Sequence, residues 1–160
     1  MTMLQSASRG RRAVAVAGAV SAGLLALSAC DKPTPVATVT VGDSSVNSEA
    51  LCYNDGKALD AASLKDCAKK AGDAKTIELG QDETVRIGVD PKIADDGWII
   101  LVNGRPFSDV SKQTYRSMPS GAFFSEQYGT QGTTNTITIE TGDGKSPAKG
   151  LWSFKVKKGF

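Results

Sequence analysis

The chain has 160 residues, with 19 basic and 17 acidic side chains and no histidine. The lack of histidine excludes Ser-His-Asp and Cys-His catalytic systems, and two thiolates alone make a poor zinc site. The first 29 residues contain three arginines and no acid, so residues 30–160 have a net charge of −1, and no basic stripe remains to indicate nucleic-acid binding.

The first 29 residues have the composition of an export signal. A basic stretch with Arg9, Arg11 and Arg12 precedes an apolar run over residues 13–27. That run is shorter than the about 20 residues of a membrane-spanning helix, which favours a cleaved signal over an uncleaved anchor or a cytoplasmic protein with an incidental apolar N-terminus. The Arg11-Arg12 pair is compatible with twin-arginine export, but the residues after it fit that motif poorly and favour the general route.

The signal ends on Leu27-Ser28-Ala29-Cys30. This pattern resembles the lipobox of bacterial lipoproteins. The resemblance implies that the Cys30 thiol receives a diacylglyceryl group, that the signal is cut before Cys30, and that the protein is held at the outer face of the cytoplasmic membrane. Two acyl chains are enough for stable anchoring, so membrane lipid is the first expected partner.

Three segments follow from this interpretation. Residues 1–29 are the signal peptide, and residues 30–35 are the lipidated Cys30 with a short polar, proline-containing tether. Residues 36–160 form the domain. About 130 residues remain after cleavage, which suits one domain with its own core.

Alternation of β-branched residues predicts the first strand, over residues 36–41. Residues 44–53 are less regular and carry no strand prediction. Residues 60–70 predict a short helix, with Asp60 as its N-cap and Gly72 close to its end.

Cys52 and Cys67 remain as an even pair once Cys30 is lipidated. In an oxidising exported environment such a pair usually forms a disulfide, which would fix the helix to the chain near Cys52. Two free thiols and a metal pair are the alternatives.

Further strands are expected at residues 76–79, 84–90, 98–102, 114–118, 135–141 and 151–158. The apolar run 98–102 indicates a strand buried on both faces, or on one face and under a loop on the other. Asn103-Gly104 predicts a hairpin turn, and Pro106 restricts the return strand to an edge or shortens it. Residues 91–96 break the alternation and are expected to cross between two sheets.

The last strand, 151–158, should point Trp152, Phe154 and Val156 inward. Ser153 and the lysines Lys155, Lys157 and Lys158 then lie outside or at the C-terminal end. We interpret these lysines as the wet face of an edge strand, where charge guards against unwanted pairing.

Seven or so short strands at regular spacing, separated by turn residues, predict an all-β fold: an antiparallel immunoglobulin-like β-sandwich with one short helix. A small barrel is the main competitor. Both Cys52 and Cys67 precede Trp98 and lie too close together for the inter-sheet bridge of antibody domains. The prediction therefore concerns architecture and not antibody homology.

Two segments are candidate binding sites. Asp95, Asp96 and Trp98 combine carboxylates with an aromatic ring, as ligand or glycan sites do, although a solvated turn before a core strand is the simpler interpretation. The loop 121–129 carries Phe123, Phe124 and Tyr128. Aromatic side chains of this kind mark protein interfaces when they are exposed and close the end of a sandwich when they are buried.

Two weaker patterns suggest no chemistry. Asp143 lies between Gly142 and Gly144, where a hairpin turn explains it better than a calcium site, because too few oxygen ligands are near in sequence. Ser146 and Lys149 match the S-x-x-K spelling of penicillin-recognising enzymes, but they lie in a turn and the companion motifs are missing.

The domain is also similar to small uncharacterised lipoproteins of high-GC Gram-positive bacteria. The similarity lies in the Cys52/Cys67 pair, residues 85–90, Gly97-Trp98 and residues 151–154. It implies no catalytic residues. We therefore expect a non-enzymatic interaction or accessory module of the cell envelope, without cofactor or metal and with an envelope protein as partner; the alternative is a lipoprotein that binds a small ligand or glycan.

Overall fold

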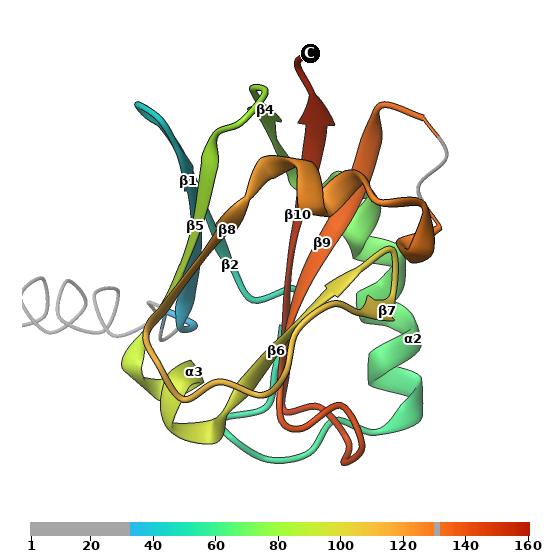
Figure 1. The fold of residues 1–160 in the computed structure, drawn as a ribbon. Coiled ribbons are helices and arrows are strands. Elements are labelled where there is room, and N and C mark those ends of the chain that lie inside the picture. Colours follow the sequence, from blue (N-terminus) through green and yellow to red (C-terminus); the bar gives the residue numbers. More distant parts are fainter. Residues whose placement is uncertain (1–32, 130–131) are drawn as a thin grey trace, which may run out of the picture. The chain divides into compact units, whose positions relative to one another are not determined.

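The computed structural model describes residues 33–129 and 132–160 (Figure 1). The expected signal peptide and Cys30 lie outside the described residues. Thr34 and Pro35, which we expected in the tether, pack as part of the domain: the Thr34 hydroxyl accepts a hydrogen bond from the Ala50 amide at 3.1 Å, and the Pro35 carbonyl accepts one from the Trp152 indole at 2.7 Å. No helix in the described part of the chain is long and apolar enough to cross a membrane.

The strands form two sheets that face each other (Figure 1). The first sheet has the order β2 (Ser44–Glu49), β1 (Val36–Val41), β5 (Thr84–Val89) and β8 (Tyr115–Pro119). The second has the order β3 (Cys52–Tyr53), β10 (Gly150–Lys158), β9 (Thr134–Thr141), β6 (Trp98–Val102) and β7 (Arg105–Pro106), and β4 (Lys75–Leu79) also pairs with β10. The described pairs are antiparallel except β4–β10, which is parallel.

The strand order confirms the β-sandwich prediction. In the immunoglobulin fold, strands A, B and E are neighbours in one sheet and C, F and G in the other. Here β1, β5 and β8 are neighbours in one sheet and correspond to A, B and E. Strands β6, β9 and β10 are neighbours in the other and correspond to C, F and G. Trp98 is buried at the start of β6, the strand that corresponds to C. The inward side chains of β5 and β9, the strands that the antibody bridge would join, are aliphatic: Val85, Ile87, Ile137 and Ile139.

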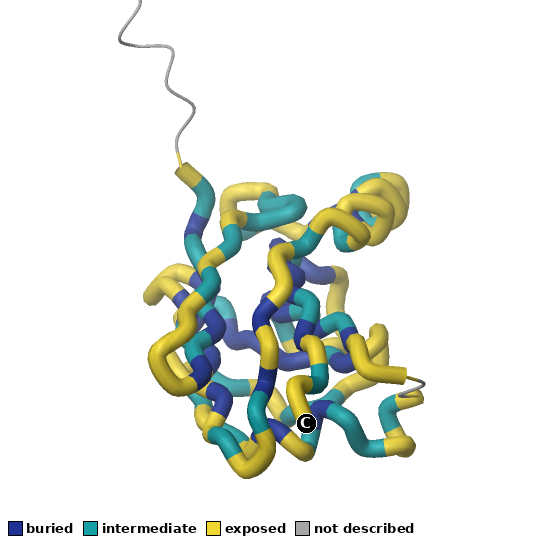
Figure 2. Tube along the Cα trace, turned by 90° about the horizontal axis from the view of Figure 1, so that it is seen from above, coloured by how far each residue is buried: buried dark blue, intermediate teal, exposed yellow. Residues whose placement is uncertain are grey.

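The core fills the space between the sheets, because alternate residues of each strand point inward. Figure 2 shows the buried residues along the inner strands and the exposed ones at the periphery. The largest fully buried side chains of the core are Trp98, Trp152, Phe123, Phe154, Leu79 and several Ile and Val residues. Ile99 points outward from β6, yet it is buried, since the turn at Gly144 lies over its side chain. This agrees with the prediction of a strand covered by a loop.

The sandwich is closed along one side and open along the other. On the closed side β2 of the first sheet lies next to β4 of the second, and the Lys75 ammonium donates to the Asn47 side-chain carbonyl at 3.3 Å. On the open side β7 and β8 are the two edges, and no pairing between them occurs in residues 33–129 and 132–160. Because β2 and β4 are not paired through their backbones in the described part of the chain, the two sheets stay separate and do not form the barrel that was the alternative.

Two expectations about strands were wrong. Residues 44–53 are not irregular, since they contain β2 and β3; β2 escaped prediction because an edge strand exposed on most of its surface needs no apolar alternation. The strand β10 is not an edge. It pairs with β3, β4 and β9, and Ser153 on its outer face is buried. Lys155 and Lys157 thus belong to a central strand and not to an edge.

The crossing between sheets occurs where it was expected, but it contains a helix. Helix α3 (Pro91–Asp96) begins with proline, whose fixed φ suits the first helical position. It buries Ile93 and Ala94 against the core. Gly97 then has φ +79°, and a Cβ there would lie 3.2 Å from Val110 Cγ1. This position therefore needs glycine for the turn into β6.

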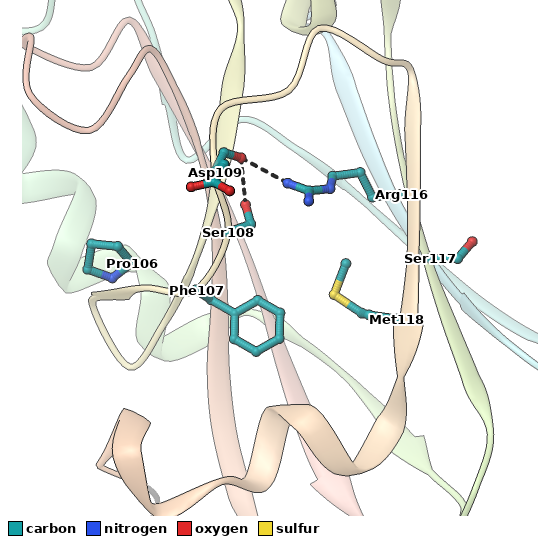
Figure 3. A pocket seen from close by; sticks show the side chains of 7 residues that line it. All are labelled: Pro106, Phe107, Ser108, Asp109, Arg116, Ser117 and Met118. Atoms are coloured by element: carbon teal, nitrogen blue, oxygen red, sulfur yellow. Dashed lines mark hydrogen bonds between the residues drawn. The ribbon is translucent and has the colours of Figure 1, made fainter.

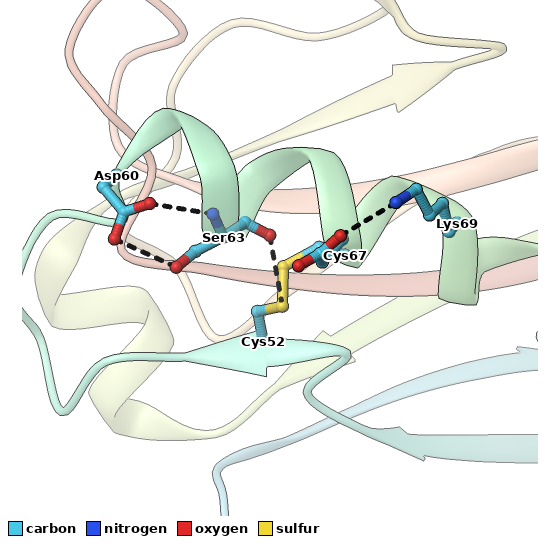
Figure 4. Close-up of polar contacts among 6 residues, drawn as sticks. Cys52, Asp60, Ser63, Cys67 and Lys69 are labelled. Atoms are coloured by element: carbon cyan, nitrogen blue, oxygen red, sulfur yellow. Dashed lines mark hydrogen bonds and ion pairs between the residues drawn. A yellow bond between two sulfur atoms is a disulfide. The ribbon is translucent and has the colours of Figure 1, made fainter.

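Helix α2 (Ala61–Lys70), followed by the 3-10 turn η1 (Ala71–Asp73), confirms the predicted helix and lies outside the second sheet (Figure 1). Asp60 is its N-cap: one carboxylate oxygen accepts from the Ser63 amide at 2.8 Å, which lowers the pKa of Asp60. The Cys52–Cys67 disulfide is present, with 5.8 Å between the Cα atoms (Figure 4). It ties α2 to β3.

Candidate binding sites

The structure separates the three residues of the first candidate site. Trp98 is fully buried and its indole N–H donates to the Gln113 carbonyl at 2.8 Å, so its ring has no free face for a ligand. Asp95 is exposed. Asp96 forms an ion pair with Lys149 at 2.5 Å, which links α3 to the segment before β10. This placement matches the simpler interpretation of a turn before a core strand.

The aromatic loop is divided between core and rim. Phe123, in the 3-10 turn η2 (Ser120–Phe124), is fully buried and stacks on Phe107, with ring centroids 4.9 Å apart. Tyr128, in the 3-10 turn η3 (Glu126–Tyr128), also packs on Phe107, with ring centroids 5.0 Å apart and an interplanar angle of 58°. Phe124 is partly buried and meets the edge of Phe160. Phe123 is therefore not accessible to a partner, and the loop closes one end of the sandwich.

A cleft of about 370 Å³ lies on the open side of the sandwich (Figure 3). Its walls are the segment 106–109 after β6 and the three β8 residues 116–118. Alternation along β8 turns Arg116 and Met118 toward the space between the sheets and Tyr115 and Ser117 away from it. We call this the lateral cleft.

The floor of the lateral cleft is apolar and its rim carries a cation. The Phe107 ring and the Met118 side chain point toward each other (Figure 3). Above them the Arg116 guanidinium donates one hydrogen bond to the Asp109 backbone carbonyl at 2.8 Å. No carboxylate of the described residues forms an ion pair with Arg116, which leaves further N–H donors of this planar group for an anion.

A second depression, of about 450 Å³, lies on the other side of the 106–110 segment. Asp143 and Lys145 line it together with Val110, whose side chain is 48% exposed. The two depressions share Pro106, Ser108 and Asp109. The segment 106–110 is thus a ridge with accessible surface on both flanks.

The prediction from sequence missed the lateral cleft. Arg116 and Met118 lie in the weakest expected strand, and Phe107 lies in what reads as a turn. The sequence did contain one signal. Arg116 and Met118 are two positions apart, so in a strand both side chains lie on the same face, and the Arg116 charge points toward the core side. Natural edge strands carry such inward charges.

Asp143 and Ser146 behave as turn residues. One Asp143 carboxylate oxygen accepts from the Lys145 and Ser146 amides at 3.0 and 2.7 Å, and these bonds lower the pKa of Asp143. Lys149 is engaged by Asp96. In the described ranges no group of three or more Cys, Asp or Glu side chains is placed to hold a metal.

Comparison with known proteins adds little. No family model and no curated protein matches the chain. Among solved structures, it is similar to the fibronectin(III)-like modules of CbhA from Clostridium thermocellum, with 16% identity, coverage of 53% of this chain and 89% of that chain, and a TM-score of 0.35. At that score the fold assignment rests on the strand order described above.

Proposed function

We propose that the chain is a lipid-anchored extracytoplasmic protein whose β-sandwich is a non-enzymatic binding module for a protein of the cell envelope. The observation that carries the binding role is the Arg116 guanidinium, held over the apolar floor of the lateral cleft without a carboxylate partner among the described residues. The anchoring role is supported by the lipobox pattern that ends at Cys30.

The chemistry of the lateral cleft defines the partner segment. Phe107 and Met118 favour an apolar side chain, since both present hydrophobic surface that is only partly buried. Arg116 favours a carboxylate, which a guanidinium can bind through two parallel hydrogen bonds. A short partner segment with an acidic residue next to an apolar one satisfies both groups.

Cross-linking in living cells tests the binding role. A photoreactive residue in place of Ser117, an exposed β8 position at the margin of the lateral cleft, should give one dominant protein adduct. Ser45 on β2 is the matched control, because it is an exposed serine on the closed side. Arg116→Ala should reduce the Ser117 adduct several-fold and leave the thermal unfolding temperature nearly unchanged. Equal adducts at both positions, or only lipid and wall adducts, would contradict the binding role.

Membrane retention tests the anchor separately. Cys30→Ala should move the protein from the membrane fraction to the soluble or precursor fraction, because no thiol is left to carry the acyl chains. Lys32→Ala, two positions away, should keep it in the membrane. Mass spectrometry of the retained protein should find a mature N-terminus at Cys30 with added lipid. Retention of Cys30→Ala, or a different N-terminus, rules the anchor out.

A further inference from the structure

A third hollow, separate from the lateral cleft and from the depression beside Val110, lies between α2 and the outer face of the second sheet. Its volume is about 340 Å³, within the range of small-molecule sites. The helical side contributes Cys67, Ala68 and Ala71, and the sheet contributes Leu101 and Leu151. We call it the α2 groove.

The groove exists because α2 is held over the sheet by a covalent bond and has small residues on its inner face. Cys67 is the one buried residue of the helix, and it is fixed to Cys52 through the disulfide (Figure 4). Ala68 and Ala71 are too short to fill the space in front of Leu101 and Leu151. A helix packed on a sheet through Leu or Ile side chains would leave no such hollow.

Glu140 lies in the wall of this groove, and its carboxylate is unpaired within residues 33–129 and 132–160. It is on the outer face of β9, opposite Leu151 of β10, and it is only partly exposed. Among the described residues no donor bonds to its carboxylate and no cation pairs with it. Burial raises the pKa of Glu140, and the nearby negative charge of Asp143 raises it further.

Two other polar side chains of the groove have each other as partners. Thr138 and Ser153 on its floor bond to each other through their hydroxyl oxygens, 3.0 Å apart. The site therefore combines apolar walls with one carboxylate that lacks a counter-charge. An occupant with a positive group and an apolar body would cover the walls and neutralise that carboxylate, whereas a fatty acid would bring a second negative charge next to it.

We propose that the α2 groove binds a small cationic amphiphile, an apolar chain that carries a protonated amine, with the amine on the Glu140 carboxylate and the chain between α2 and the sheet. This site does not depend on the lateral cleft or on the lipid anchor. Its volume fits a chain of modest length and is far below that of a partner helix with its side chains.

Titration with three probes that share one chain tests the charge requirement. Octylamine, octan-1-ol and octanoate are added below their micelle-forming concentrations, and amide shifts of Ala68, Leu101 and Leu151 are followed by NMR. Octylamine should bind at least about tenfold more tightly than octan-1-ol, as one hydrogen bond between charged groups allows. Octanoate should bind more weakly than both.

Two variants place the probe in the groove. Glu140→Gln should reduce the affinity for octylamine to that for octan-1-ol without changing the latter, whereas Glu49→Gln, an exposed carboxylate on β2, should change neither. Ala68→Leu adds bulk at an exposed helix position that lines the groove, and it should weaken the binding of both octylamine and octan-1-ol. This variant keeps the test valid if Glu140→Gln misfolds. Equal affinities of amine and alcohol for the natural chain, or no shifts at groove residues, would overturn the proposal.

Discussion

Phe123→Ala will lower the free energy of unfolding by about 3–5 kcal/mol, the usual cost of removing a buried phenylalanine ring. Phe123 is 0% exposed and stacks on Phe107 with an interplanar angle of 16°. Removal of the ring leaves a cavity under the η2 turn and deprives Phe107 of its stacking partner. Phe124→Ala should cost only about 1 kcal/mol, because the Phe124 side chain is partly exposed and its ring contact is with Phe160.

Urea unfolding of the two variants, with unchanged slopes, measures this difference. The contrast between Phe123 and Phe124 separates a core role of the loop from an interface role. If both variants were as stable as the natural chain, the stack would not belong to the core, and the loop would return as a candidate partner surface. If both lost several kcal/mol, Phe124 would also be a core residue.

Replacement of both cysteines, Cys52→Ala with Cys67→Ala, should lower the free energy of unfolding by about 3 kcal/mol, the chain-entropy estimate for a loop of this length. The bridged residues are 15 positions apart. A local effect should accompany the global one, because Cys67 is the residue through which α2 is buried. Amide exchange in α2 should therefore accelerate far more than exchange in β9.

Calorimetry measures the global loss of stability, and hydrogen exchange measures the local effect in α2. A matched control is Ala62→Ser on the exposed side of α2, which removes no contact. An unchanged exchange rate in α2 would show that packing holds the helix without the bridge. A loss well below 1 kcal/mol would show that the bridge does not restrict the unfolded chain.

The local parts of the fold could be predicted from the sequence because their signals are local. Alternation marks β5 and β9, the Asp60 cap marks α2, and Asn103-Gly104 marks the turn into the short β7. Alternation reports which side of a strand is buried. It carries no information about which strands are neighbours.

The errors come from that non-local part. Lys155 and Lys157 look like the exposed face of an edge strand, yet β10 is central, because β4 returns parallel to it from residues far away in the sequence. Ser153 looks exposed and is buried, since the outer face of β10 is covered from the α2 side. A helix that lies over a sheet can bury a serine whose hydroxyl finds a partner, here Thr138.

The candidate sites show the same limit. Phe123, Phe124 and Tyr128 are adjacent in sequence and invite one interpretation, but their burial differs because only Phe123 reaches the core. The lateral cleft brings Phe107 to Met118 across the open side of the sandwich. Glu140 becomes partly buried in a groove only because α2, which lies between β3 and β4 in the sequence, packs near β9 in space.

The central place of β10 also sets the order in which the domain can form during synthesis. Trp152, Phe154 and Val156 enter the core with this last strand, and its end pairs with Leu79 through Lys158. A chain that emerges N-terminus first has β4 and β9 ready but no strand to join them. Since pairing between such distant segments is intrinsically slow, nearly the whole polypeptide is made before the core closes, and a chain that stops before Gly150 leaves both strands without their common neighbour.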